Sequence, residues 1–321
     1  MKKSLYAAGL IIAVLIAISG WLISTYTSEG PLEQPTTIVF EPNTHFTTIA
    51  DMLAEQSVIR HPFIFKVTLF LTGQSSHIKA GEYRFMPHIS ARETAQLLAS
   101  GKGLIHHLTV PEGLTTYEIL DMLKHNDLLA GEITLAPKEG ELLPETYNFT
   151  RGEKRNDLIL RMQHAMEKAL AEAWEQRAPD LPFTSPEQAL TLASIVEKET
   201  GLDTERAHVA AVYINRLKKG MLLQADPTTA YAVSHGKGKM TRALNRKDLE
   251  MASPYNTYRS AGLPPGPIAN PGKASILATL HPLQSEDIYF VATGIGGHNF
   301  ARTAAEHERN VKKYLENLRS K

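Results

Sequence analysis

The 321-residue sequence contains no cysteine, so disulfide bonds, thiol nucleophiles and thiolate metal sites are excluded. It also lacks an excess of charge, because 34 basic residues balance 34 acidic ones, and no run of five basic residues occurs. A protein that binds nucleic acid is expected to carry a strongly basic surface, so nucleic acid is not an expected partner. Long apolar runs are scarce as well, and the one that is present lies near the N-terminus.

This apolar run extends from Leu5 to Ser24, twenty residues without a charged side chain. At about 1.5 Å per residue, its length matches the roughly 30 Å hydrocarbon core of a membrane. Trp21 and Tyr26 lie where aromatic residues gather at a membrane interface. A cleaved signal peptide is the alternative, but the run is long and no clean small-x-small site ends it. The sequence therefore predicts an uncleaved transmembrane anchor over residues 5–24.

The charges around the run predict its orientation. Lys2 and Lys3 precede it, and no basic residue follows directly after Ser24. By the positive-inside rule, residues 1–4 are expected in the cytoplasm. The protein is then expected to be a single-pass protein of the cytoplasmic (inner) membrane, with the bulk of the chain in the periplasmic or extracytoplasmic space.

A polar segment with two prolines, residues 25–37, is typical of a linker. It is followed by a mixed α/β region over residues 38–130 that contains a weak internal repeat. Val39–Ile59 and Leu108–Leu129 each predict a short strand, a turn containing proline, and a helix. Such units suit a module that binds glycans or peptides. A stalk that only holds the next domain away from the membrane is the alternative.

The helix starts in this region carry recognisable capping signals. Thr47–Thr48 and Thr115–Thr116 supply N-cap side chains, and Glu118 completes a capping box with Thr115. Between the repeats, Ala80–Gly103 predicts a strand, a turn, and a serine-capped helix that ends in glycines.

Residues 131–321 form the expected second domain, and its pattern is mostly helical. Helices are predicted where apolar residues recur at three- to four-residue spacing, and a strand hairpin where an apolar run precedes a glycine-rich turn. The chain ends in a charged amphipathic helix. The expected helices cover residues 156–178, 185–200 and 204–220, and the expected strands cover 288–292 and 298–303. Together these patterns predict an α+β fold.

The second of these helices ends in two glutamates that flank a lysine. On a helical wheel, Glu197 and Glu199 fall on the two edges of the apolar face, about 160° apart, and Lys198 points to solvent. The paired carboxylates of a glycosidase flank one bond at roughly 5–9.5 Å, so this spacing does not encode such a pair. A solvated helix end and an acid in a cleft both remain open on this pattern. The buried direction is expected along Ala189, Leu192, Ala193, Ile195 and Val196.

About fifty residues after the third helix are dense in turn formers, and a segment of that kind is uncommon in a compact domain unless it is functional. Its aromatic, amide and acidic side chains suit sugar recognition. The alternative is a wrapping loop that prolines make rigid and polar groups cap. The candidate sugar contacts are Gln224, Asp226, Tyr255, Asn256, Tyr258 and Asn270.

Neither a metal nor a cofactor is expected. The thirteen histidines include no H-E-x-x-H motif, and His106 and His107 are adjacent on an expected strand, so they face opposite sides. The sequence "TGIGGH" lacks the Lys-Ser/Thr that completes a phosphate loop, and Ser194 lacks the G-x-S-x-G context of a serine hydrolase.

Six motifs carry a resemblance to a known family. They are, in order, "KAGEYRF", "EGELLPETY", "ASIVEKET", "LQADPT", "YNTYRSAGLPPGPIANPG" and "YFVATGIGGHNFARTAAEH". Together they resemble the MltG-type (YceG-like) endolytic murein transglycosylases from about Ile38 to the C-terminus. The resemblance implies a membrane-anchored lytic transglycosylase with a LysM-like module over 38–130 and a catalytic domain over 131–321. It implies cleavage of the MurNAc–GlcNAc β-1,4 bond of peptidoglycan, with 1,6-anhydro-MurNAc ends, and partnership with peptidoglycan synthases at the membrane.

In that family the first glutamate of the E-K-E motif is catalytic, which implies Glu197 as the catalytic acid and Glu199 as a supporting neighbour. One carboxyl suffices, because the C6 hydroxyl of the sugar attacks C1 and no water has to be activated. The resemblance assigns no direct role to Glu145 or His298. A muramidase that uses water, and a non-catalytic peptidoglycan-binding scaffold of the synthesis machinery, remain the alternatives.

Overall fold

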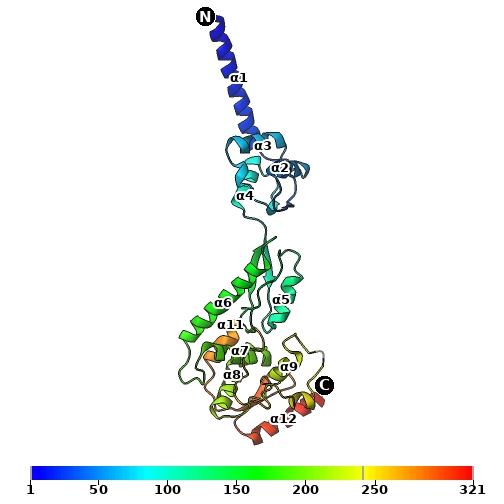
Figure 1. Cartoon of the computed structure of the whole chain (residues 1–321), viewed down its shortest axis with the longest axis vertical. Helices are drawn as coiled ribbons and strands as arrows, with labels where there is room; N and C mark the ends of the chain where they lie inside the picture. The colour runs from blue at the N-terminus through cyan, green and yellow to red at the C-terminus, as the bar shows by residue number, and fades with distance from the viewer. Residues whose placement is uncertain (1, 241, 320–321) are drawn as a thin grey trace. The chain divides into compact units, whose positions relative to one another are not determined.

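The computed structural model describes residues 2–240 and 242–319 (Figure 1). The chain folds as a mixed α+β protein with two compact units, each of which has its own hydrophobic core. The division differs from the expected boundary at residue 130, because the helix of the second predicted repeat belongs to unit 2. Unit 1 comprises Met1–His106 and Asn148–Glu153, and unit 2 comprises His107–Tyr147 and Lys154–Lys321.

Unit 1 begins with the long helix α1 (Lys2–Thr27). Within it, Gly9–Thr27 is the one stretch of the described residues that is long and apolar enough to cross a membrane. Its large apolar side chains, such as Leu10 and Ile16, are exposed. An exposed apolar helix of this length fits either a membrane anchor or a signal segment.

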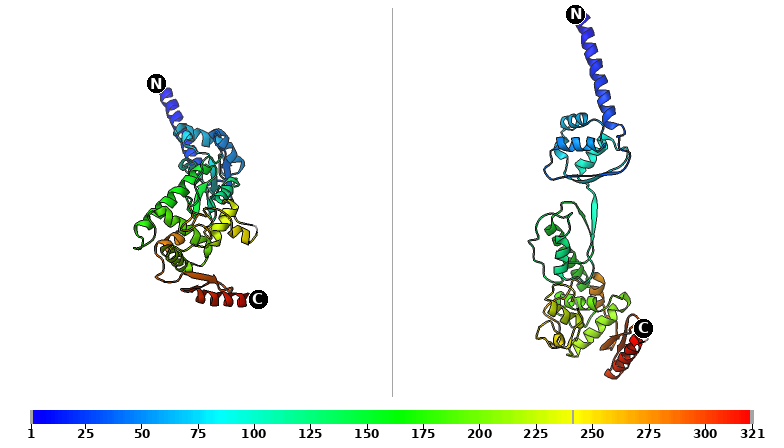
Figure 2. Two further views of the ribbon diagram at one scale, coloured as in Figure 1. Left: turned by 60° about the horizontal axis from the view of Figure 1, so that its bottom comes forward. Right: turned by 90° about the vertical axis from the view of Figure 1, so that its right-hand side faces the viewer.

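The rest of unit 1 is built on one antiparallel strand pair, β1 (Thr36–Phe40) and β2 (Gly81–Phe85), in which Ile38 lies opposite Tyr83. Buried aromatic rings from both strands share one hydrophobic core with residues of the short helices. Figure 2 draws the ribbon of these strands and helices in two further views. The order is strand, helix, helix, strand, and then a further helix; whether this module is LysM-like stays a prediction. The helices are α2 (Phe46–Glu55), α3 (Pro62–Leu71), the 3-10 turn η1 (Ser75–His77) and α4 (Ala91–Ser100).

Two of the predicted capping signals are confirmed and one is wrong. Ser90 and Thr115 each accept a hydrogen bond from the backbone N–H of the glutamate three residues later, and that glutamate bonds back to them. By contrast, Thr47 and Thr48 lie inside the first turn of α2, and His45 occupies the N-cap position without a side-chain cap. The apolar residue before the threonines is itself helical, so the helix starts earlier than the capping residues suggest.

Unit 2 consists mainly of helices, and the boundary between the units falls within the strand pair β3 (Ile105–Thr109) and β4 (Thr146–Thr150). The predicted C-terminal hairpin is confirmed as β5 (Tyr289–Ala292) and β6 (His298–Ala301). The helices are α5 (Thr116–Lys124), α6 (Arg155–Glu175), α7 (Pro186–Glu199), α8 (Asp203–Lys218), α9 (Asp226–Ser234), α10 (Arg246–Leu249), α11 (Lys273–Leu280) and α12 (Ala304–Arg319).

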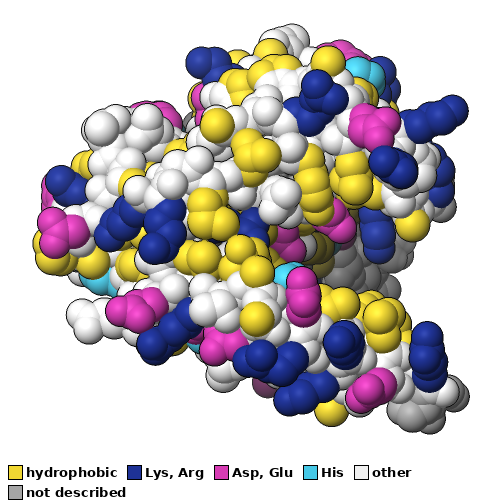
Figure 3. Space-filling view, turned by 90° about the horizontal axis from the view of Figure 1, so that it is seen from below, with side chains coloured by type: hydrophobic (Ala, Val, Ile, Leu, Met, Phe, Trp, Pro, Cys, Tyr) yellow, Lys and Arg dark blue, Asp and Glu magenta, His cyan; other side chains and the backbone are white. Residues whose placement is uncertain are grey.

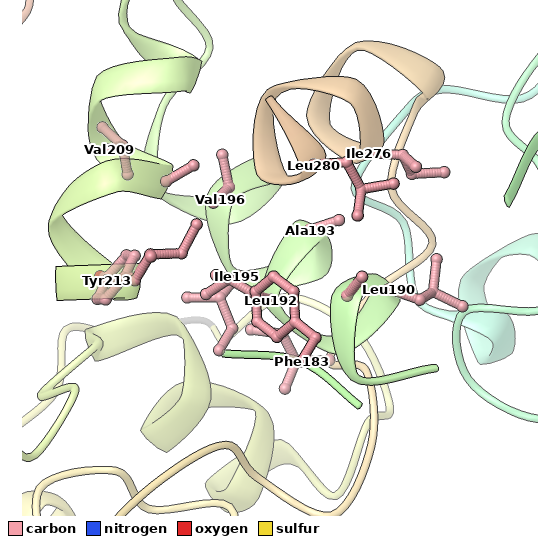
Figure 4. Close-up of a cluster of buried hydrophobic side chains, with 14 of the residues drawn as sticks. Phe183, Leu190, Leu192, Ala193, Ile195, Val196, Val209, Tyr213, Ile276 and Leu280 are labelled. Carbon is pink, nitrogen blue, oxygen red and sulfur yellow. The ribbon is translucent and has the colours of Figure 1, made fainter. Parts of the chain in front are cut away.

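Helix α7 is the centre of the unit 2 core, where it packs against α6, α8, α9 and α11 (Figure 4). The eight consecutive residues Ala189–Val196 are all buried. The expectation of a single buried direction was therefore too narrow, because neighbouring helices cover α7 on several sides and the loop at Ile268 reaches Ser194. Ser185 occupies the N-cap position without a side-chain cap, and Pro186 begins the helix as predicted. Each fully buried leucine or isoleucine contributes roughly 1.5–3 kcal/mol to this core.

The turn-rich segment contains more regular structure than the sequence suggests. Helix α9 lies within it and buries Thr228 and Thr229, whose hydroxyls are hydrogen-bonded to Ala225 O and to the Asn256 side chain. The helix was missed because its pattern is polar, and those polar side chains are satisfied inside the fold rather than by water.

Candidate active site

The two glutamates at the end of α7 point to different neighbours, as the wheel predicts. Glu197 faces the start of α11, where its Oε2 accepts hydrogen bonds from Gly272 N (3.0 Å) and Ser275 Oγ (2.8 Å). Glu199 faces α8, where its Oε1 accepts a hydrogen bond of 2.6 Å from the Tyr213 hydroxyl. The two carboxyl groups therefore do not form a catalytic pair.

Glu197 belongs to a cluster of charged side chains that includes a residue from the turn before α5. Arg206 Nη2 lies 3.8 Å from Glu197 Oε1 and 3.6 Å from Glu112 Oε2, and Arg206 also pairs with Asp203. The side chains of Glu197 and Arg206 are only 6% and 8% exposed. Through these contacts Glu197 connects the end of α7 with the start of α11 and with Arg206 of α8.

The backbone around this cluster is tied together as well. Lys198 Nζ donates to Gly113 O at 2.9 Å, and Gly113 N donates to Asn270 O at 2.9 Å. A Cβ on Gly272 would lie 1.7 Å from the carboxylate of Glu112, so a larger residue there would require the Glu112 side chain to move. Burial and the neighbouring Glu197 charge raise the pKa of Glu112, and Arg206 opposes this rise.

Glu199 has a different environment. Its side chain is buried, which raises its pKa to about 7, and the nearby charge of Asp226 adds to the rise. The hydrogen bond from Tyr213 and the charge of Arg216 act in the opposite direction. Burial also raises the pKa of Tyr213 well above its ordinary value, so its hydroxyl stays a donor. A carboxyl group with a pKa near neutrality exists in both protonation states at working pH, which suits a general acid and base.

Two of the predicted sugar contacts, Asp226 and Tyr258, lie near enough to Glu199 to interact with its charge. Asp226 begins α9, is exposed, and accepts a hydrogen bond of 2.6 Å from the Tyr258 hydroxyl. Gln224 is also exposed, has a positive φ of 50°, and donates its N–H to Thr257 O. The structure thus brings Asp226 and Tyr258 together near Glu199, and Gln224 lies on the loop just before α9.

The two predicted asparagine contacts are fully buried instead. Asn256 Nδ2 donates to the carbonyls of Leu249 and Met251, and its Oδ1 accepts from Thr229. Asn270 Oδ1 accepts from Leu142 N at 2.9 Å, and its Nδ2 donates to neighbours that include Leu114 O. The structure gives both side chains a role in holding loops, and no polar atom of either is left over for a sugar.

One pocket in unit 2 has a volume of about 900 Å³ and lies along the N-terminal half of α7. Neither Glu197 nor Glu199 lines it. The predicted contact Tyr255 does, and its ring packs against Tyr231 with centroids 5.0 Å apart. The pocket is therefore a place separate from the acidic end of the helix.

Glu145 and His298 make contacts of their own. Glu145 pairs with Lys273 at 3.0 Å on the surface. His298 Nδ1 lies 2.8 Å from Glu205 Oε2, and its backbone N–H donates to the same carboxylate. Neither residue contacts Glu199 through a described hydrogen bond.

Within residues 2–240 and 242–319, no group of three or more His, Asp or Glu side chains could hold a metal ion. His106 is paired instead with Glu82, at 2.6 Å. The face drawn in Figure 3 mixes basic, acidic and hydrophobic side chains and is hollowed beside a charged ridge, without one dominant sign of charge.

The site contains residues that the sequence did not single out, above all Tyr213, Arg206, Glu112 and Ser275. Tyr213 and Arg206 lie on α8. The apolar residues of this helix predict how it packs, but they do not indicate a role for its polar side chains. Glu112 follows a proline and precedes a glycine, which marks a turn but not a neighbour of α7.

Curated relatives match the chain over most of its length. An endolytic murein transglycosylase of Bacillus subtilis is 31% identical over 307 residues, which cover 86% of this chain and 83% of that protein. An endolytic murein transglycosylase of Streptococcus pneumoniae is 24% identical; the match covers 98% of this chain but 65% of that protein, just under two thirds.

A crystal structure of a yceG-like protein from Listeria monocytogenes is also similar, with a TM-score of 0.54 and 29% identity. The match covers 86% of this chain and 98% of that one. The sequence model described as the YceG-like family matches residues 38–313, which include most of both units and every residue of the site above. The chain belongs to the YceG-like family.

Proposed function

We propose that this protein is an endolytic murein transglycosylase, which cleaves peptidoglycan glycan strands at MurNAc–GlcNAc β-1,4 bonds and leaves 1,6-anhydro-MurNAc ends. The names of the curated relatives support this activity. The observation that carries it is the buried carboxyl of Glu199, with a pKa of about 7, among residues suited to sugar recognition. By this cleavage it terminates or trims nascent glycan strands, and peptidoglycan synthases at the membrane are its expected partners.

Glu199 is the acid that the geometry favours, in place of Glu197, which the resemblance implied. A general acid must carry a proton near neutral pH, and burial gives Glu199 that property. Glu197 is instead held by Gly272, Ser275 and Arg206, contacts that fit a loop-holding carboxylate. The two residues thus exchange the roles first expected for them.

In the proposed reaction, protonated Glu199 gives its proton to the glycosidic oxygen as the bond from C1 to that oxygen breaks. The resulting carboxylate accepts the proton of the C6 hydroxyl as that oxygen bonds to C1, so no water is consumed. The Tyr213 hydroxyl donates a hydrogen bond to Oε1 of Glu199, so we assign both proton transfers to Oε2. The negative charge of Asp226 stabilises the oxocarbenium-like charge that develops on the sugar.

Mass spectrometry of the glycan products tests both the activity and the acid. We expect anhydro ends from the wild type and from Glu197→Gln, and a loss of roughly 10²- to 10⁴-fold in rate for Glu199→Gln. Full activity of Glu199→Gln together with loss in Glu197→Gln would restore the first assignment. Reducing ends would indicate a muramidase, and binding of glycan without any cleavage would indicate a scaffold.

We further propose that α1 is an uncleaved anchor, with the N-terminus in the cytoplasm and the rest of the chain outside. The exposed apolar surface of Gly9–Thr27 supports this. Because the chain has no cysteine, single substitutions can report the topology. A membrane-impermeant thiol reagent on intact cells should label Ser28→Cys but not Ser4→Cys; the reverse pattern would refute the orientation.

A further inference from the structure

The 900 Å³ pocket lies along the same helix as the proposed acid but away from it. Thr191 lines the pocket, and Glu199 follows eight residues later on α7, which is about 12 Å along the helix axis. Leu217 of α8 lines the pocket. Tyr213, one turn earlier on the same helix, donates its hydroxyl hydrogen bond to Glu199. Helix α9 likewise places Tyr231 in the wall of the pocket and Asp226 near Glu199. Pocket and acid are thus parts of one scaffold, and a single extended ligand is able to engage both.

The walls of the pocket offer flat apolar surfaces. Tyr231 and Tyr255 pack with their ring centroids 5.0 Å apart at 43°, and both rings line the pocket. Aromatic rings of this kind cover the apolar face of a sugar while their hydroxyls reach polar groups. The neighbouring wall is a loop rich in proline, made of Leu263, Pro264, Pro265, Gly266 and Pro267.

The buried carboxyl of Glu139 holds this aromatic wall in place. It accepts hydrogen bonds from Thr116 N (2.7 Å), from Asn270 Nδ2 (3.1 Å) and from the Tyr231 hydroxyl. Burial raises the pKa of Glu139, and these hydrogen bonds oppose the rise. A ring that is fixed before binding loses little freedom when a ligand arrives, so the wall is preorganised.

The rim of the pocket is polar. Lys138, Glu141, Glu187 and Gln188 surround the aromatic and proline walls. A mixture of charged, amide and apolar groups suits hydroxyl and acetamido substituents on a ring better than it suits a wholly apolar ligand. The volume lies within the range of pockets that bind small organic molecules, roughly 300–1,000 Å³.

We propose that this pocket binds sugars of the same glycan strand at a distance from the bond that is cut, so that cleavage falls within strands rather than at their ends. This inference rests on the proposed function. Holding a strand at two places raises the effective concentration of the scissile bond at Glu199, and a fragment with only the two sugars of that bond does not reach the pocket. The pocket thereby favours internal bonds of long strands over short fragments.

Kinetics with long and short substrates test the proposal, with full-length protein in detergent. Tyr255→Ala removes one sugar-binding face, Glu187→Trp fills the rim, and Tyr117→Ala is a control that removes an exposed tyrosine elsewhere in unit 2. For uncross-linked long glycan strands, we expect the two pocket variants to raise KM roughly 3- to 10-fold with kcat unchanged. For a disaccharide that contains only the cut bond, and so does not extend from Glu199 to the pocket about 12 Å away along α7, we expect no change.

Equal losses on long and short substrates would overturn the proposal, because they would indicate general damage to the fold. Unchanged KM for long strands in both pocket variants would overturn it as well. The affinity for long strands is also measured in Glu199→Gln and in the double variant Glu199→Gln/Tyr255→Ala. This comparison tests the pocket separately from the proposed activity. If the wild type does not cleave, the activity is refuted, while weaker binding caused by Tyr255→Ala would still support the pocket.

Discussion

The ionisation of Glu199 is expected to make the folded protein less stable as the pH rises. Burial raises the pKa of this residue from 4.5 to about 7. A group with a higher pKa in the folded state binds its proton more tightly there than in the unfolded chain. The stability that this proton contributes is therefore fully present below about pH 4.5 and is lost as the pH rises through about 7.

The size of the effect follows from the pKa difference. At 1.36 kcal/mol for each unit, a rise from 4.5 to about 7 corresponds to about 3 kcal/mol. Glu199→Gln keeps the shape and the acceptor for the Tyr213 hydroxyl but has no charge to bury. We therefore expect the variant to match the wild type near pH 4.5 and to exceed its free energy of unfolding by up to about 3 kcal/mol near pH 8.

Urea unfolding followed by tryptophan fluorescence measures this difference. The chain has two tryptophans, and Trp174 on α6 lies in unit 2, so a Trp21→Phe background reports unit 2 alone. Glu197→Gln is the matched control. It weakens the hydrogen bonds from Gly272 and Ser275, and we expect it to destabilise by about 1–3 kcal/mol at neutral pH.

Two results would refute this reasoning. If the difference between Glu199→Gln and the wild type were the same at every pH, the buried charge would not be its cause. If Glu197→Gln stabilised the protein at high pH and Glu199→Gln did not, the titrating buried carboxyl would be Glu197.

Three further changes test the packing around the site. Tyr213→Phe removes a hydrogen bond that lowers the pKa of Glu199, so the basic limb of the pH–rate profile should move to higher pH, and a move to lower pH would contradict this. Asn270→Ala leaves backbone donors and acceptors without partners and should cost about 1–3 kcal/mol in urea unfolding. Gly140→Ala, at φ of 86° and with its Cβ 2.6 Å from the Pro267 ring, should cost about 1–3 kcal/mol, and a neutral effect would show that the turn relaxes.

Much of the fold was predictable because many of its signals are local. The capping boxes at Ser90 and Thr115 act within four residues, and both start helices where expected. The glycine-rich turn between β5 and β6 likewise joins neighbouring strands. Helix α9 was not predictable, because its polar residues are satisfied by distant parts of the chain, which a local pattern does not reveal.

The site was less predictable for the same reason. An asparagine in a turn-rich loop is chemically suited to bind a sugar or to hold the loop, and only burial distinguishes the two roles. Asn256 and Asn270 are fully buried with loop-holding hydrogen bonds, whereas Asp226 is exposed. Glu112 contacts the cluster of Glu197 and Arg206 from far along the chain, and no spacing rule connects residues so far apart.

The placement of two glutamates two residues apart on one helix end has a physical consequence for catalysis. Side chains at that spacing diverge by about 160°, so one helix end faces two different environments. Glu197 accepts hydrogen bonds from Gly272 and Ser275 beside Arg206, contacts that connect α7 with α8 and α11. Burial and the charge of Asp226 keep the proton of Glu199 near neutral pH, against the opposing hydrogen bond from Tyr213. A spacing of four residues would place both acids in one environment, and their repulsion would couple their titration. Because the C6 hydroxyl replaces water as the nucleophile, the reaction needs only one such acid, and the other is available to build the site around it.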